Sequence, residues 1–555
     1  MRRTLLVTLS LAVTLVAMAA AIVPASAETN YGNPVTADRP VPVPDTAHCS
    51  VTVMQHTFAA SYYQPYVGTW SPPADCPGPW SKVVLTLSGS VAGRQYDRIS
   101  GIWIGGAEVM RTSTPEPDPA GISWQVQKDV TEYSPLFTAN QSVQVQLDNI
   151  YNSTYTGAFD ETLTLTFYEA SQAAPAGAHP DQVIGVTNPV GTNTGEWSYL
   201  NSAGDAISSP VTFPRNLTRL DAEVYTSGHG CEEFWYGNQP DSYAGPNGLC
   251  GGGPYREVDV YLDGRLAGEA MPFPTVFTGG WNPILWRPIP GVRAFDLTPY
   301  ELDLTPFAGT LTDGQPHTVS VRVANQEGFW LTDADLLAYT DPNSTQTTGA
   351  VTSYSAPALS EQDSYQANGT NAGVFTTTAS HTLTVSGYVK SSAGQTTSTV
   401  TEKLGDQNVQ QVNLNNFLEN IQASATDDAG TTTVAPDGTT SVTSLQQTFP
   451  FTGQSAYITH KNGPNSGQFN LPAHLDFSDI DSWSTTVNGT LRSWTKLNNE
   501  VIAAAKLKEG GTAGTSAVGS TSQDYDFSDS TGVCYNHYLS ADQGYVTTDE
   551  MKPAC

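Results

Sequence analysis

The sequence predicts an all-β protein with two tandem jelly-roll-like antiparallel β-sandwiches, followed by a third β-rich region. Many short segments alternate apolar and polar residues, and turns rich in glycine and proline separate them. Only 14% of the 555 residues are charged, whereas 49 are glycine and 37 are proline. This composition is typical of sandwiches and not of helical bundles.

The N-terminus has the pattern of a secretory signal peptide. Two arginines precede a mostly apolar run over residues 5–23, and Ala-Ser-Ala at 25–27 forms a small-residue cleavage site. An uncleaved membrane anchor is the alternative, because the run is nearly long enough to span a bilayer. The cleavage site favours a secreted, extracellular protein that loses residues 1–27 and then has no stable membrane association.

Period-two alternation predicts half-buried strands along the chain. The clearest examples are 81–89, 141–149, 161–169, 218–226, 255–264 and 317–325. Only two stretches suggest helix, 413–421 and 498–509. We therefore expect an N-terminal sandwich over 45–172, a second sandwich over 180–342 and a C-terminal β-rich region over 345–555.

An internal repeat supports the two sandwiches. Arg98 lies eight residues before Gly106, and Arg256 lies eight residues before Gly264. In each case an alternating segment fills the interval. The alternative is chance similarity between β-sheet sequences, but a tandem architecture accounts for the common order more simply.

The six cysteines allow fifteen pairings, and export favours disulfides over free thiols. By position they fall into three neighbouring couples, Cys49 with Cys76, Cys231 with Cys250, and Cys534 with Cys555. The chain has no C-x-x-C and no H-x-x-x-H motif, so we expect neither a metal site nor a cofactor. The net charge of −30 argues against a nucleic-acid partner, which would require a basic surface.

Chemistry in this chain has to come from carboxylates, because the G-x-S-x-G, P-loop and H-E-x-x-H motifs are missing from the sequence. In YTSGHGCEEFWYGN (225–238), Glu232 and Glu233 stand beside Trp235. Paired carboxylates in a partly desolvated pocket have separated pKa values, and aromatic faces suit sugar rings. Asp97 and Arg98, in GRQYDRISGIWIGG, form either a second reactive group or a simple surface pair. These residues predict a carbohydrate site, catalytic or not.

Three segments, 80–137, 215–243 and 254–307, resemble the peptide N-glycosidase A family. The similarity extends over about 45–340 and is looser beyond 345. It implies an amidase that acts on N-glycosylated peptides and glycoproteins. Members of the family hydrolyse the amide bond between the glycan and asparagine, release the intact glycan and leave aspartate.

A more distant resemblance, to the peptide N-glycosidase F group, implies an active site at the junction of two sandwiches. Its Trp-Asp-Arg motif matches Tyr96-Asp97-Arg98, and its Cys-x-Glu-Trp motif matches 231–235, with Phe234 inserted. The second cysteine of that motif is missing, and Cys250 is the substitute partner for Cys231. The resemblance implies catalytic roles for Asp97, Glu233 and Asp148. It implies substrate contacts for Arg98, Glu232, Trp235, Arg256, Trp281 and Arg287.

Asp97 is expected to act as the general base, Arg98 to stabilise the oxyanion, and Glu232 or Glu233 to hold the proton for the leaving glycosylamine. Two other functions fit the same residues. An endoglycosidase acting on the glycan core would also need two carboxylates. A secreted glycan-binding module would need only the aromatic surface.

Overall fold

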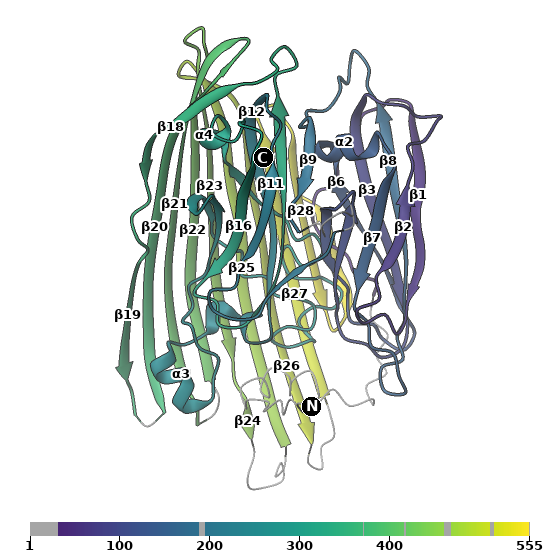
Figure 1. Cartoon of the computed structure of the whole chain (residues 1–555). Coiled ribbons are helices and arrows are strands. Elements are labelled where there is room, and N and C mark those ends of the chain that lie inside the picture. Colours follow the sequence, from purple (N-terminus) through teal and green to yellow (C-terminus); the bar gives the residue numbers. More distant parts are fainter. Residues whose placement is uncertain are drawn as a thin grey trace, which may run out of the picture.

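The computed structural model describes residues 32–187, 195–369, 371–415, 418–459, 468–510 and 516–553. The predicted signal peptide therefore lies outside the described residues. Within them, the strands form five antiparallel sheets in three groups along the chain. Figure 1 shows two compact groups of strands side by side, with a large sheet of long strands behind the second group.

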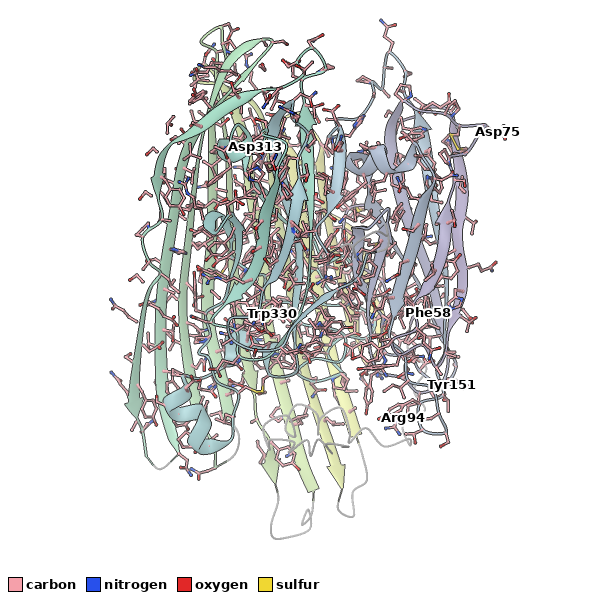
Figure 2. The ribbon with its side chains drawn as sticks, in the orientation of Figure 1. Phe58, Asp75, Arg94, Tyr151, Asp313 and Trp330 are labelled. Carbon is pink, nitrogen blue, oxygen red and sulfur yellow. A yellow bond between two sulfur atoms is a disulfide. The ribbon has the colours of Figure 1, made fainter. Side chains whose placement is uncertain are left out.

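The first sandwich consists of two four-stranded sheets. One has the order β1 (His48–Phe58), β8 (Phe159–Glu169), β3 (Trp80–Val91) and β6 (Ile122–Asp129). The other has the order β2 (Tyr66–Trp70), β7 (Gln141–Leu147), β4 (Ile99–Ile104) and β5 (Ala107–Ser113). β6 and β8 alternate buried and less buried residues, whereas β5 is buried along its whole length; Phe58 is fully buried in the core (Figure 2).

The second sandwich repeats this arrangement strand for strand. One sheet has the order β10 (Ser198–Leu200), β17 (Phe329–Thr340), β12 (Leu217–His229) and β15 (Tyr300–Asp303), and β9 (Gln182–Gly185) also pairs with β17. The other has the order β11 (Ile207–Thr212), β16 (Pro316–Ala324), β13 (Glu257–Leu262) and β14 (Arg265–Ala270). The predicted internal repeat is thus present, and Arg98 and Arg256 occupy equivalent positions directly before β4 and β13.

The C-terminal region forms a twelve-stranded sheet in the described part of the chain. It begins with β18 (Thr348–Ser355), β19 (Ser360–Ala367), β20 (Ala372–Ser391), β21 (Gly394–Asn413), β22 (Leu418–Val434) and β23 (Thr440–Ser455). It continues with β24 (Ile458–Thr459), β25 (Gln468–Val487), β26 (Thr490–Gly510), β27 (Ser516–Asp529), β28 (Cys534–Asp542) and β29 (Tyr545–Met551).

One face of this sheet packs against the second sandwich. Leu383 and Val385 of β20 belong to the core of that sandwich. Phe449, Phe451 and Phe477, from β23 and β25, form a separate core with residues of the loops that follow β12 and β14. The C-terminal sheet therefore supports the sandwich and the loops at its end.

The helices are short, and the longest in the described ranges is α3 (Asp241–Asn247). The helix predicted over 498–509 is wrong, because these residues lie in β26. Val501, Ala503, Ala505 and Leu507 are buried, and the residues between them are exposed. Pairing with β25 and β27 overrides the helix propensity of alanine and lysine. The second predicted helix, 413–421, is also wrong over its described residues, which close β21 and open β22.

Two of the three cysteine couples form disulfides, Cys49–Cys76 and Cys231–Cys250. The third couple includes Cys555, which lies outside the described residues. None of the described helices is long and apolar enough to cross a membrane.

Candidate active site

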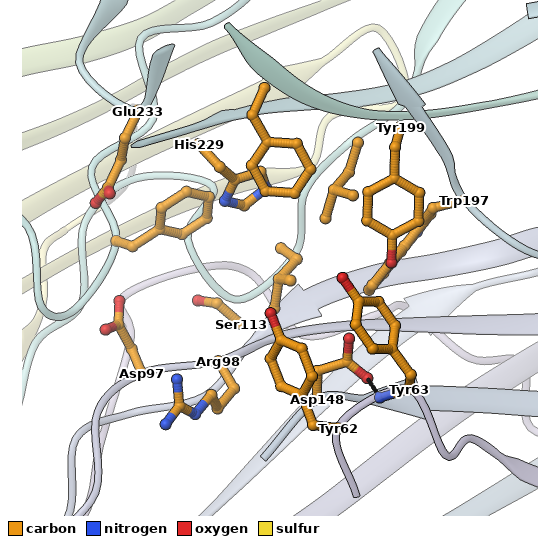
Figure 3. Close-up of a pocket in the computed structure, with 14 residues that line it drawn as sticks. Tyr62, Tyr63, Asp97, Arg98, Ser113, Asp148, Trp197, Tyr199, His229 and Glu233 are labelled. Carbon is orange, nitrogen blue, oxygen red and sulfur yellow. Dashed lines mark hydrogen bonds between the residues drawn. The ribbon is translucent and has the colours of Figure 1, made fainter. Parts of the chain in front are cut away.

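A pocket of about 260 Å³ opens at the junction of the two sandwiches. The first sandwich contributes Tyr62, Tyr63, Asp97, Arg98, Ile99, Ser113 and Asp148 to its lining, and the second contributes Trp197, Tyr199, His229, Glu233, Phe277, Phe329 and Leu331. Asp97 and Glu233 lie at one end, and Asp148 lies with Tyr62 and Tyr63 at the other (Figure 3). All three carboxylates that the sequence predicts as catalytic, Asp97, Glu233 and Asp148, therefore line one pocket.

Asp97 precedes β4, and its carboxylate is held by a backbone amide. The Gly279 N–H donates to Asp97 Oδ2 at 3.0 Å. A Cβ atom at Gly279 would lie 2.5 Å from Asp97 Oδ1, so only glycine allows this close approach. Burial raises the pKa of Asp97, while the Gly279 amide and the Arg98 guanidinium oppose that rise.

Glu233 lies in the turn that follows β12, the central strand of its sheet. The 3-10 turn Gly230–Glu232 ends at Glu233, and the disulfide from Cys231 to Cys250 ties this turn to the loop beyond α3. Burial, with the nearby Asp97 carboxylate adding to it, raises the pKa of Glu233 to about 8. Glu233 is therefore protonated at neutral pH and can donate a proton.

Glu232, its neighbour, points away from the pocket and anchors the turn. Arg256 donates to both of its carboxylate oxygens, Nε to Oε2 at 2.7 Å and Nη2 to Oε1 at 2.9 Å. The Trp330 indole donates to Oε2 at 2.8 Å, and the Glu327 amide donates to Oε1 at 3.1 Å. Trp330, labelled in Figure 2, is buried in the core that the loops after β12 and β14 form with the C-terminal sheet. Neither side chain of the Glu232–Arg256 pair is exposed, so the structure does not bring them to the pocket.

The C-terminal sheet supports the same loop from behind. Asn408 donates to the Tyr236 carbonyl at 2.8 Å, and Gln410 donates to the Asn238 carbonyl at 3.1 Å. The ring of Tyr236 packs 4.5 Å from that of Phe451 between centroids. Trp235 is buried in this core, and Trp281 packs between Phe234 and Phe451. Both tryptophans, predicted as substrate contacts, are therefore outside the pocket lining.

Another carboxylate, Glu116, lies near Asp97, and no sequence motif indicates it. Glu116 Oε1 would be 3.1 Å from a Cβ at Gly279, on the same side as Asp97. Burial raises the pKa of Glu116 to about 7, although Arg287 donates to it at 2.9 Å. Arg287, another predicted substrate contact, thus holds Glu116 and does not line the pocket.

Asp148 directly follows β7 and is fixed by two donors. The Tyr63 amide donates to Oδ1 at 3.0 Å, and Gln146 donates to Oδ2 at 3.2 Å. Burial raises its pKa. Tyr63 is 64% exposed beside it, and its ring is 6.4 Å from that of Tyr199. This end of the pocket is therefore an aromatic surface around one carboxylate.

Arg98 and His229 complete the polar lining. Arg98 Nη2 donates to Gln95 Oε1 at 2.7 Å, which directs the guanidinium toward the Asp97 end of the pocket. His229 stacks on Phe277 with an interplanar angle of 6°, and Nε2 lies 3.0 Å from Ser227 Oγ. Burial lowers the pKa of His229 to about 3, so this ring is neutral. The His229 ring therefore lines the pocket as a neutral group and does not act as a proton donor near neutral pH.

The chain matches the family model described as peptide N-acetyl-beta-D-glucosaminyl asparaginase amidase A over residues 34–357. It is 32% identical over 536 residues to the peptide-N4-(N-acetyl-beta-glucosaminyl)asparagine amidase A of Prunus dulcis. That alignment covers 93% of this chain and 92% of the relative.

Among solved structures, similar folds include PNGF-II, with 14% identity, a TM-score of 0.37, and coverage of 53% of this chain and 66% of that chain. Another is PNGase F from Flavobacterium meningosepticum, with 12% identity, a TM-score of 0.35, and coverage of 53% and 96%. At these scores neither structure bears on the residues of the pocket.

Proposed function

The chain belongs to the peptide N-acetyl-beta-D-glucosaminyl asparaginase amidase A family and is an amidase that cleaves N-glycans from asparagine; we propose that the pocket between its sandwiches is the active site. The observation that supports this proposal is that Asp97 and Glu233, from different sandwiches, line one pocket. The two carboxylates have different surroundings, as an acid and a base in one reaction require.

Asp97 acts as the general base in this proposal. It takes a proton from water as the water oxygen bonds to the side-chain carbonyl carbon of the glycosylated asparagine. The Gly279 amide donates to Asp97 Oδ2 and orients the carboxylate, and in this proposal Oδ1 receives the proton. A positioned base of this kind contributes about 10²–10⁴-fold to the rate.

Glu233 acts as the general acid. The tetrahedral intermediate collapses when its carbon–nitrogen bond breaks, and the glycosylamine nitrogen needs a proton at that moment. With a pKa of about 8, Glu233 carries that proton at neutral pH. Glu232 is fully engaged by Arg256, so the choice between the two glutamates falls on Glu233.

Arg98 stabilises the oxyanion that forms on the carbonyl oxygen. Its guanidinium is fixed by Gln95 and borders the pocket beside Asp97. A donor held in place before the reaction lowers the barrier without reorganisation. Asp148 and the tyrosines around it bind the sugar at the other end, where carboxylate acceptors suit hydroxyl groups and aromatic faces suit the sugar ring.

Mass analysis of a glycopeptide digested in oxygen-18 water tests the reaction. An amidase leaves aspartate with one labelled oxygen and an intact glycan. An endoglycosidase would leave one sugar on asparagine, and a binding module would leave the glycopeptide unchanged. The Asp97→Asn variant should give no product, whereas Asp160→Asn, at an exposed position on β8, should react like the wild type.

We further propose that the chain is secreted and acts on glycopeptides and glycoproteins outside the cell. The signal-peptide pattern over 1–27 and the two disulfides support this location. Detection of the protein in the medium, with an N-terminus near residue 28, would test it. A protein that stays in the cell with Met1 in place would contradict it.

A further inference from the structure

A second group of titratable side chains lies outside the pocket lining, between the second sandwich and the C-terminal sheet. Glu257 and Asp259 share one face of β13, and Glu269 of β14 stands opposite Asp259. His381 of β20 completes the group. All four are buried, with exposed fractions of 2%, 0%, 0% and 8% in that order.

The ligand atoms of this group converge. Those of Glu257, Asp259 and His381 all lie within 4.8 Å of one another. His381 Nδ1 is 3.1 Å from both carboxylate oxygens of Glu257 and 2.8 Å from Glu269 Oε2. Neighbouring ligands of an ion bound at about 2.1 Å have separations of this size when they are roughly 90° apart.

The hydrogen-bond partners of His381 show which of its ring nitrogens carries the hydrogen. His381 Nε2 is 2.9 Å from the Pro357 carbonyl, which can only accept, so Nε2 carries the hydrogen. In the neutral ring Nδ1 then presents a lone pair to carboxylate oxygens, which have lone pairs of their own. A positive species has to separate them, either a proton or a metal ion. A hydrogen bond from the second ring nitrogen to a backbone carbonyl is the usual support of a metal-binding histidine.

Buried oxygen atoms without hydrogen-bond partners favour the metal. Glu269 Oε1 and Asp259 Oδ1 are buried and accept no hydrogen bond from any residue that the structure describes. Arg322 is paired with Asp259 through its other oxygen, at 2.8 Å. A divalent ion among these ligand atoms would give the unpartnered oxygens a partner and would lie against the His381 Nδ1 lone pair at the same time.

We propose that Glu257, Asp259, Glu269 and His381 bind one divalent transition-metal ion that fastens the second sandwich to the C-terminal sheet. A mixed set of imidazole and carboxylate ligands suits Zn²⁺ or Mn²⁺ better than Ca²⁺, which takes oxygen ligands. The sequence shows no metal-binding motif because His381 is 124 residues from Glu257 along the chain. The site is separate from the proposed catalytic pocket, so the two proposals stand or fall independently.

Metal analysis of the full chain tests the proposal. The purified protein is incubated with Zn²⁺, Mn²⁺ or Ca²⁺ in parallel, freed of unbound ion, and analysed for metal and for thermal unfolding. We expect one equivalent of Zn²⁺ or Mn²⁺ per chain, and a melting temperature that rises with metal and falls with chelator. His381→Ala should lose both effects.

His317→Ala is the matched control, because His317 also contacts two aspartates, Asp263 and Asp313, but at exposed positions. It should keep the metal. Absence of bound metal in the wild type, retention of metal by His381→Ala, or binding of Ca²⁺ alone would each overturn the proposal.

Glu269→Gln keeps the test decisive if His381→Ala does not fold. Under the metal proposal, this variant binds metal more weakly, and metal raises its melting temperature less than that of the wild type. If a proton on His381 holds the cluster instead, added metal changes the melting temperature of neither the wild type nor the variant, and the proposal is overturned.

Discussion

The two sandwiches share one strand order, yet equivalent positions in them have opposite surroundings. Arg98 precedes β4 and borders the pocket beside Asp97. Arg256 precedes β13 and is completely buried against Glu232. The arginine that precedes the strand thus borders the proposed substrate pocket in the first sandwich. The equivalent arginine in the second sandwich anchors a loop.

The difference lies in how each carboxylate is compensated. Glu232 accepts four hydrogen bonds, two of them from a guanidinium, and has no capacity left for chemistry. Asp97 and Glu233 are half-buried with far less compensation, and desolvation raises the pKa of both. Compensated carboxylates stabilise the fold, and weakly compensated ones in a pocket are available for reaction.

The largest effect on activity is expected from Asp97→Asn. Loss of the base should lower kcat by about 10²–10⁴-fold. The melting temperature should stay the same or rise, because a buried carboxylate with a raised pKa is removed. Steady-state kinetics on a glycopeptide and thermal unfolding of the same sample check both expectations. Near-normal turnover would mean that another group is the base.

A change in the Glu232–Arg256 ion pair, which anchors the turn, should lower stability as well as activity, unlike Asp97→Asn. Arg256→Met leaves Glu232 buried without its partner and should cost about 3–5 kcal/mol of unfolding free energy, with activity lost as the Glu233 turn shifts. Adding Glu232→Leu should restore much of that stability, because no charge then remains buried. Denaturant unfolding of both variants measures this. If the double variant were less stable than Arg256→Met, the anchor would not act as a charge pair.

The titration of Glu233 should make both the stability of the protein and its activity depend on pH. Its folded-state pKa of about 8 exceeds the ordinary value of 4.5. The stability it contributes is full below pH 4.5 and is lost as pH rises through 8. Glu233→Gln should therefore lose less stability across that window than the wild type. As the general acid loses its proton, wild-type kcat/KM should fall above about pH 8, and this decline should be absent in the variant.

The smallest effect is expected at the aromatic end of the pocket. Tyr63→Ala keeps the backbone amide that donates to Asp148 but removes an exposed ring. We expect KM to rise by roughly 2–10-fold, for a contact worth about 0.5–1.5 kcal/mol, with kcat unchanged. Tyr545→Ala, an exposed tyrosine on the C-terminal sheet, should leave KM unchanged. A change confined to kcat would place Tyr63 nearer the reacting bond.

Local sequence patterns were enough for most of the strands, and the resemblance to known motifs pointed to the carboxylates Asp97, Glu233 and Asp148 that line the pocket. Alternation located strands such as β3, β8 and β16, and the repeat indicated a common strand order. Asp97 and Glu233 stood in short, dense motifs. The error over 498–509 arose because alanine and lysine favour helix in isolation, whereas strand pairing on both sides decided the structure.

The remaining site residues depended on contacts between distant segments. Glu232 and Glu233 are adjacent in sequence, and only the position of Arg256 distinguishes the anchor from the acid. Glu116 and Gly279 reach Asp97 from separate loops without any motif. The same applies to the predicted substrate contacts Trp281 and Arg287, whose partners Phe451 and Glu116 come from other parts of the chain.

Single-turnover kinetics of Asp97→Asn, Glu233→Gln and the double variant test most directly whether the two sandwiches supply one catalytic unit. If base and acid act in one reaction in a common pocket, the double variant should be about as slow as the slower single variant. Losses that multiply fully in the double variant would show that the two carboxylates act independently, and would contradict a shared active site.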